Sequence, residues 1–258
     1  MLAKERQNRI EIMVGERGAV TTGDLVKRFG VSLETIRRDL LTMEQAGKLT
    51  RVHGGAVRKG NVIPFEKLAQ RNRVHGTEKE ELGQNAMRFI SEGDIIGVDA
   101  GSTAISVAKA IRDRFSKLTV VTISMDVFDI LRENEGISVI LCGGRFMREE
   151  NAFFGALTRE AIKQINVSKW FLFPSAVSLE HGVCCDLEEC FSLYQQMEIS
   201  AGQVYMLADS SKFEKRALLK LHDMTPNHIY VTDSGLSEEL RKLYRENGMR
   251  VYSGRNEE

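Results

Sequence analysis

The stretch GVSLETIRRDLLTMEQAGKLTRVHGGAV, residues 30–57, joins a helix pattern to a hairpin pattern. Ser32 is placed to cap the helix. The apolar residues that form its buried stripe recur at helical spacing: Ile36, Leu40 and Met43. This stripe directs Thr35, Arg37 and Arg38 away from the core, within the turns that a recognition helix presents to the major groove of DNA. Arginine suits that task because its planar fork can bond guanine or grip a phosphate with two parallel hydrogen bonds.

A β-hairpin is expected directly after this helix, over residues 48–58. Gly54 and Gly55 can supply the positive φ angles of a tight turn. Arg51 and His53 are two residues apart, so they share one face of a strand. A hairpin that follows a recognition helix is a wing, whose tip can touch the DNA backbone or the minor groove.

Two further helix patterns precede this stretch, one closed by Gly18 and one running from a Thr21 or Thr22 cap to Gly30. Residues 1–58 therefore predict a winged helix-turn-helix domain. Residues 1–60 hold 12 Lys+Arg against 7 Asp+Glu, a net +5, and the remaining residues hold 24 against 29, a net −5. A basic head on an acidic body favours a polyanionic partner for the head. The competing interpretation makes Arg37 and Arg38 ordinary surface charges that pair with neighbouring acids.

The rest of the chain divides into a linker, residues 59–76, and a second domain, residues 77–258. Thr77 and Glu80 have the spacing of a capping box at the start of a helix. Strand and helix patterns then alternate, which predicts a parallel-rich, Rossmann-like α/β sheet. The expected strands are DIIGVDA, LTVVTIS, ISVILCG, KWFLFPS, QVYMLAD and HIYVTD.

Small and polar loops follow three of these strands, at the sheet edge where such folds bind ligands. Gly101 allows a close backbone turn, and Ser102 and Thr103 with the free N–H groups of the next helix make an anion site. The other two loops contain glycines or acids beside a cation: Gly143-Gly144-Arg145 and Asp209-Ser210-Ser211-Lys212. Together the three loops predict a pocket for a small phosphorylated ligand.

Over residues 4–252 the chain resembles the DeoR family of bacterial sugar-responsive repressors. Six segments carry the resemblance: ERQNRI, TIRRDL, HGGA, DAGST, CGGRF and LADSSKF. The resemblance implies a second domain similar to sugar-phosphate isomerases and CoA transferases that acts as an effector sensor rather than a catalyst. It implies DNA contacts from the recognition helix and the wing: Ser32, Thr35, Arg37, Arg38, Arg51, His53 and Gly54. It also implies that Gly101, Ser102 and Thr103 hold a phosphate that Lys212 reaches, with Asp99 and Asp209 orienting sugar hydroxyls or the lysine. Ser124, Gly143, Gly144 and Arg145 complete the expected effector site.

Departures from the family pattern bear on the ligand. Ile123 stands before Ser124 where the family usually has an amide, and the segment Pro174-Ser175-Ala176-Val177-Ser178 lacks the acid that related isomerases use. General acid–base chemistry needs a titratable group near the substrate, so the alternative of an isomerase-like enzyme carrying a winged domain is disfavoured. A less polar ligand, or a pocket that no longer binds one, stays open.

We therefore expect a repressor of a carbohydrate operon that binds double-stranded operator DNA as a homodimer or homotetramer. No apolar run is long enough to span a membrane and no leader is recognisable, so we expect a cytoplasmic protein with no membrane partner. The spacing of His181, Cys184, Cys185 and Cys190 does not match common zinc sites. We predict no cofactor, metal or catalytic residue.

Overall fold

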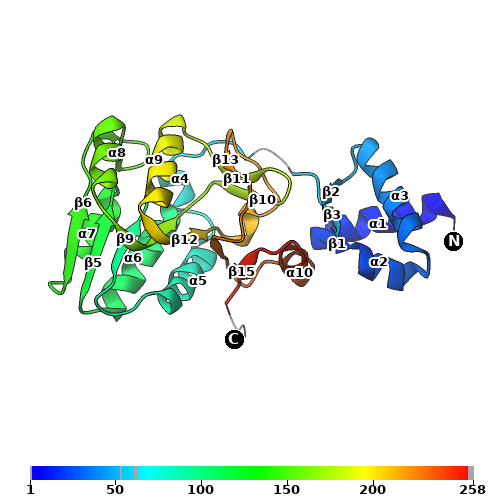
Figure 1. Ribbon diagram of the computed structural model, residues 1–258, viewed down its shortest axis with the longest axis horizontal. Coiled ribbons are helices and arrows are strands. Elements are labelled where there is room, and N and C mark those ends of the chain that lie inside the picture. Colours follow the sequence, from blue (N-terminus) through cyan, green and yellow to red (C-terminus); the bar gives the residue numbers. More distant parts are fainter. Residues whose placement is uncertain (1, 53, 61–62, 255–258) are drawn as a thin grey trace.

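The computed structural model describes residues 2–52, 54–60 and 63–254. An N-terminal domain of three helices and a small sheet lies at one end of the molecule, and a larger α/β domain forms the rest (Figure 1). The elements of the N-terminal domain are α1 (Ala3–Arg17), β1 (Ala19–Thr21), α2 (Thr22–Phe29), α3 (Leu33–Gln45), β2 (Thr50–Val52) and β3 (Gly55–Val57). The strands pair antiparallel in the order β1-β3-β2, which gives the winged helix-turn-helix arrangement.

Local signals in the sequence account for the ends of these helices. The Thr21 hydroxyl accepts a hydrogen bond from the Asp24 amide at 3.1 Å, and Gly30 ends the same helix with φ of 62°. In the wing, Gly54 has the expected positive φ of 82°, but Gly55 does not. Gly55 is needed for a different reason, because a Cβ there would lie 2.1 Å from the Val20 carbonyl oxygen.

The α/β domain is built on a seven-stranded sheet in which every neighbouring pair is parallel, in the order β15-β14-β12-β9-β4-β5-β6. The strands are β4 (Ile95–Val98), β5 (Leu118–Thr122), β6 (Ile137–Leu141), β9 (Val167–Leu172), β12 (Ala201–Leu207), β14 (Ile229–Val231) and β15 (Arg250–Tyr252). The fold class is confirmed, and β15 is a strand that the sequence patterns missed. The chain leaves β4 toward one side of the sheet and β9 toward the other, so a crevice opens at their carboxyl ends.

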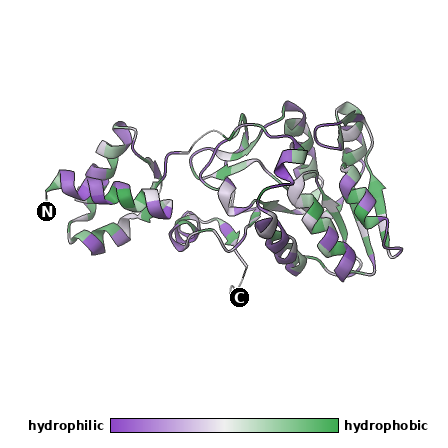
Figure 2. Cartoon of the chain, turned by 180° about the vertical axis from the view of Figure 1, so that it is seen from behind, coloured by the Kyte–Doolittle hydropathy of each residue, from purple (hydrophilic) through white to green (hydrophobic). Residues whose placement is uncertain are grey.

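Helices cover both faces of this sheet, and apolar side chains from two separate clusters fill the space between. One face carries α5 (Gly76–Ala86), the short helix η1 (Met87–Phe89), α6 (Ser102–Arg114) and α7 (Met125–Leu131). The other carries α8 (Ala156–Lys163), α9 (Glu188–Ile199) and α10 (Glu238–Glu246). Figure 2 shows hydrophilic residues along the outward faces of the helices, as two-sided burial of the sheet requires.

Smaller elements lie above the carboxyl edge of the sheet. They are the hairpin β7 (Arg145–Met147) and β8 (Ala152–Phe154), the sheet of β10 (Ala176–Ser178), β11 (Gly182–Cys185) and β13 (Leu219–His222), and the short helix η2 (Ser210–Lys212). None of the helices in the described part of the chain is long and apolar enough to cross a membrane.

The linker contains the short helix α4 (Leu68–Arg71). The helix that follows it, α5, begins at a different residue from the predicted one. The prediction of a capping box at Thr77 and Glu80 is wrong, because the N-cap of α5 lies two residues earlier. His75 is the N-cap, with φ of 55°, and its carbonyl accepts from the Lys79 amide at 3.1 Å. This start directs the first turn of α5 toward the crevice, which places Lys79 in the candidate site described below.

The winged domain is packed against α10 (Figure 1). Lys242 donates to both carboxylate oxygens of Asp24, at 2.9 and 3.0 Å, and Arg17 pairs with Glu239 at 3.0 Å. The Ser237 hydroxyl donates to the Arg17 carbonyl at 2.7 Å. Apolar residues of β1 and α10 also belong to one core cluster, so the contact combines burial with ion pairs.

Candidate nucleic-acid interface and candidate ligand pocket

The exposed side of α3 carries two arginines without local partners. Arg37 and Arg38 are both exposed, and within the described residues neither forms an ion pair. Asp39, one of the acids that could have neutralised them, is buried and binds Arg6 at 2.5 Å and Gln7 at 3.0 Å instead. Since that acid is occupied, the two guanidinium groups are available to phosphates or base edges.

The start of α3 is fixed by the predicted cap. The Ser32 hydroxyl accepts from the Thr35 amide at 3.2 Å and lies 2.9 Å from the Thr35 hydroxyl. The wing is tied to the same unit, because the Arg51 amide donates to Glu44 at 2.8 Å and the Gly54 carbonyl accepts from the Thr22 amide at 2.8 Å. His53 lies outside the described residues.

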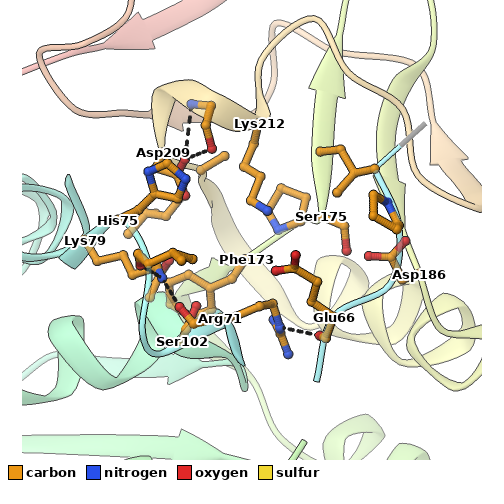
Figure 3. A pocket seen from close by; sticks show the side chains of 18 residues that line it. Glu66, Arg71, His75, Lys79, Ser102, Phe173, Ser175, Asp186, Asp209 and Lys212 are labelled. Carbon is orange, nitrogen blue, oxygen red and sulfur yellow. Dashed lines mark hydrogen bonds between the residues drawn. The ribbon is translucent and has the colours of Figure 1, made fainter. Parts of the chain in front are cut away.

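The crevice at the carboxyl edge of the main sheet is a pocket, and four of the predicted effector residues line it. Ser102 and Thr103 form the first turn of α6, and Asp209 and Lys212 come from the loop after β12 (Figure 3). Gly101 is the residue before α6, with φ of 138°, and a Cβ there would lie 3.8 Å from Arg71 Nη1. The free N–H groups of a helix start make this corner favourable for an anion.

The opposite wall of the pocket comes from the linker and the start of α5, which the sequence interpretation had not included. Arg71, His75 and Lys79 lie there, facing Lys212 across the opening (Figure 3). The Lys79 ammonium donates to the Val74 carbonyl at 2.6 Å, and burial lowers the pKa of this lysine. The basic residues between 71 and 79 were visible in the sequence, but no periodicity assigned them to a site.

A smaller pocket adjoins the first and shares five lining residues with it: Glu66, Arg71, Phe173, Ser175 and Asp186. Asp99 lies here, and burial raises its pKa to about 6 although its carboxylate accepts from the Tyr194 hydroxyl. Glu150 lines the same pocket. It pairs with Arg71, burial raises its pKa, and its second oxygen is buried with no hydrogen-bond partner among the described residues.

The two adjoining pockets together therefore have two chemically different ends. One end, at α6, Lys79 and Lys212, presents cations and backbone N–H groups that suit a phosphate or carboxylate. The other end, at Asp99 and Glu150, presents carboxyl oxygens that can accept hydrogen bonds from hydroxyl groups.

The structure does not bring the remaining predicted effector residues into either pocket. Ser124 is buried as the N-cap of α7, accepting from the Val127 amide at 3.3 Å. Gly144 makes a close approach to α8, since a Cβ there would lie 2.1 Å from the Thr158 hydroxyl, and Gly143 precedes it in the same turn. Arg145 is exposed and paired with Glu189 at 2.7 Å.

The departures at Ile123 and Ala176 also lie away from the pocket. Both side chains are fully buried in apolar clusters, Ile123 behind the main sheet and Ala176 in β10. These two substitutions therefore do not alter the pocket lining, whereas Pro174 and Ser175 of the same departing segment are part of it.

Comparison with known families finds a matching family model for each of the two domains. The model of the DeoR-like helix-turn-helix domain matches residues 6–61, and that of the DeoR C terminal sensor domain matches residues 74–234. The transcriptional repressor AccR of Agrobacterium fabrum is 32% identical over 249 residues, which cover 93% of this chain and 96% of that protein. The lactose phosphotransferase system repressor of Streptococcus mutans is 30% identical, covering 94% and 97%.

The chain belongs to the DeoR family, and it is a DNA-binding transcriptional regulator and not an enzyme. Among solved structures, ribose 5 phosphate isomerase A from Neisseria gonorrhoeae is similar at 15% identity with a TM-score of 0.39, covering 52% of each chain.

Proposed function

We propose that the protein is a repressor of a carbohydrate-metabolism operon and that a small phosphorylated sugar or related metabolite controls its binding to operator DNA. One observation carries this proposal: the segment that leaves the winged domain also forms a wall of the cationic pocket. The names of two relatives, AccR and the lactose phosphotransferase system repressor, support the repressor role.

In this proposal the phosphate binds where the α6 N-terminus meets Lys79 and Lys212. The hydroxyl groups of the sugar would point toward Asp99 and Glu150 in the adjoining pocket. Arg71 lies between the two ends and is held by the Glu66 carbonyl at 3.0 Å and by Glu150. A ligand that spans both ends would contact α4, and thereby change the position of the linker.

The same segment supplies a physical route from ligand to DNA. Only a few residues separate the last strand of the wing, which ends at Val57, from Ile63 at the pocket. A ligand that prefers one linker arrangement shifts the population of winged-domain positions by its difference in affinity for the two. We further propose that two copies of the chain present paired winged domains to two half-sites in the cytoplasm, because a single small domain rarely gives enough specificity.

Thermal unfolding in the presence of sugar phosphates, the matching free sugars and inorganic phosphate tests the proposal. A ligand at about a hundred times its dissociation constant stabilises the folded state by about 2.7 kcal/mol, which a melting curve resolves. We expect one phosphorylated sugar to raise the Tm, and the shift to disappear in Arg71→Ala and Lys212→Ala.

The control is Lys163→Ala, which removes an exposed lysine of α8 outside the pocket and should keep the full shift. The stabilising sugar phosphate should also weaken binding to an operator fragment in the wild type but not in Arg71→Ala. A stabilising ligand that leaves operator affinity unchanged contradicts the regulatory step, and a shift that survives both pocket variants contradicts the site.

A further inference from the structure

Glu198, His222 and His228 form a cluster at the end of the sheet opposite the ligand pocket. Glu198 is in the last turn of α9, His222 ends β13, and His228 immediately precedes β14. One ligand atom of each residue lies within 4.8 Å of the other two. The three residues are 24 and 6 positions apart in the sequence, which is not a spacing typical of metal ligands, so the sequence alone did not indicate this cluster.

The hydrogen bonds of His222 determine which of its nitrogens is free. Its Nδ1 lies 2.7 Å from the Asp223 carbonyl oxygen, which can only accept, so Nδ1 carries the hydrogen. In the neutral ring, Nε2 then has a lone pair, and this atom lies 2.9 Å from a Glu198 carboxylate oxygen. Two acceptors at that separation repel each other unless a proton or a metal ion lies between them. A carbonyl behind the ligating histidine is also a common support of metal sites, because it fixes the ring and its tautomer.

His228 supplies the third group, and one of its ring nitrogens has no hydrogen-bond partner among the described residues. This nitrogen is Nδ1, and it is buried. The rings of His222 and His228 meet edge to face with centroids 5.2 Å apart, so both lie beside the Glu198 carboxylate.

The charged side chains next to the cluster do not add a fourth ligand to it. The Asp223 side chain is directed to Lys220, at 2.6 Å, and is not a fourth ligand. Arg250 is a neighbouring cation, and its guanidinium is bonded to the carbonyls of Pro226 and Asn227, at 2.9 and 2.8 Å. Those bonds hold the loop that carries His228 in place.

We propose that Glu198, His222 and His228 bind a divalent late first-row transition metal ion, with Zn²⁺ the best match. Two imidazoles and one carboxylate are a common zinc ligand set, with water in the fourth position. Tetrahedral coordination requires ligand atoms about 3.3 Å apart, so side-chain rotations that draw the three groups inward complete the site. The ion would join α9 to β13 and β14, elements that lie far apart in the sequence, and so brace the sensor domain.

Zinc titration of the chelator-treated full-length protein, followed by calorimetry and thermal unfolding, tests this site. We expect one Zn²⁺ per chain, a higher Tm with zinc, and at least tenfold weaker binding in each of Glu198→Gln, His222→Gln and His228→Gln. His181→Gln, which alters a comparably exposed histidine paired with Glu180, should bind zinc as the wild type does. Unchanged affinity in Glu198→Gln and His228→Gln, or no saturable binding at all, overturns the proposal.

Cobalt substitution separates the cluster from the cysteines, because a thiolate ligand adds a sulfur-to-metal charge-transfer band to the absorption spectrum. We expect the bound Co²⁺ to lack that band, and Cys184→Ser with Cys185→Ser to leave binding unchanged. Loss of binding in the cysteine variant would overturn the assignment. Because Co²⁺ is read by absorption, a histidine variant that is less stable but folded at low temperature still gives an answer.

Discussion

The Tyr244 hydroxyl of α10 donates a hydrogen bond to the carboxylate of Glu214, two residues beyond Lys212 of the pocket loop. Both side chains are buried. The Glu214 amide is held by the Val177 carbonyl at 2.8 Å, and its carboxylate also accepts from the Leu179 amide at 3.3 Å. Because α10 is the helix that contacts the winged domain, this bond directly connects the pocket loop to the domain interface.

Replacement of Glu214 by glutamine should change the pH dependence of stability. Burial raises the pKa of Glu214 to about 7, from 4.5. As the pH rises from 4.5 to 7, the carboxyl ionises in the unfolded chain before it does in the folded one, which favours unfolding. The wild type should therefore lose about 3 kcal/mol of stability relative to Glu214→Gln across that window, at about 1.4 kcal/mol for each unit of pKa difference.

Thermal or urea unfolding of both proteins between pH 4.5 and 8 measures this difference. Glutamine can still accept from Tyr244, so the two curves should converge near pH 4.5 and separate toward neutral pH. Tyr244→Phe is the informative companion, because it removes the donor that stabilises the ionised carboxylate and should extend the loss of stability to higher pH. Curves that stay parallel throughout would show that folding does not change the pKa of Glu214.

Reversal of charge at Asp24 or Lys242 should loosen the winged domain from α10. The side chains are 44% and 41% exposed, so solvent screening limits this pair to under about 1 kcal/mol despite its two hydrogen bonds. We expect Asp24→Lys and Lys242→Glu each to speed cleavage after Phe65 in the linker by up to about fivefold, with a protease specific for aromatic residues. The double variant should restore the wild-type rate, and Lys163→Glu should have no effect. Independent, additive effects of the two reversals would rule out a direct pair.

The winged domain could be predicted almost residue by residue because its signals are local. Ser32 and Thr21 cap the helices that their sequences mark, and Gly18 and Gly30 end theirs with positive φ. The parallel sheet followed from its apolar runs in the same way. The strand β15 was missed because its three residues, of which only Val251 is buried, form neither an apolar run nor a measurable periodicity.

The pocket was predicted only in part, because half of it depends on tertiary arrangement. The loops after β4 and β12 could be placed, since parallel strands bring their carboxyl ends to one edge. Arg71 reaches that edge from a segment with no regular pattern, and Lys79 reaches it from the first turn of α5, through contacts formed only in the folded chain. The loop that contains Gly144 has the composition of a ligand-binding loop, but in the structure Gly144 packs closely against Thr158.

Substitution of Arg37 and Arg38 by alanine should separate their roles on DNA. Each phosphate that the protein neutralises releases counterions from the DNA. Loss of one phosphate contact therefore reduces the slope of the logarithm of the DNA association constant against the logarithm of the salt concentration by about 1, and it weakens binding to all DNA sequences alike. Loss of a base contact instead costs about 1–3 kcal/mol on the operator and relaxes the preference at one position. We expect both variants to bind an operator fragment more weakly than the wild type at two salt concentrations, each with one of these signatures.

Arg9→Ala, which removes an exposed arginine of α1 paired with Glu5, is the matched control and should bind as the wild type does. If Arg37→Ala and Arg38→Ala also retain wild-type affinity and salt dependence, α3 is not the recognition helix.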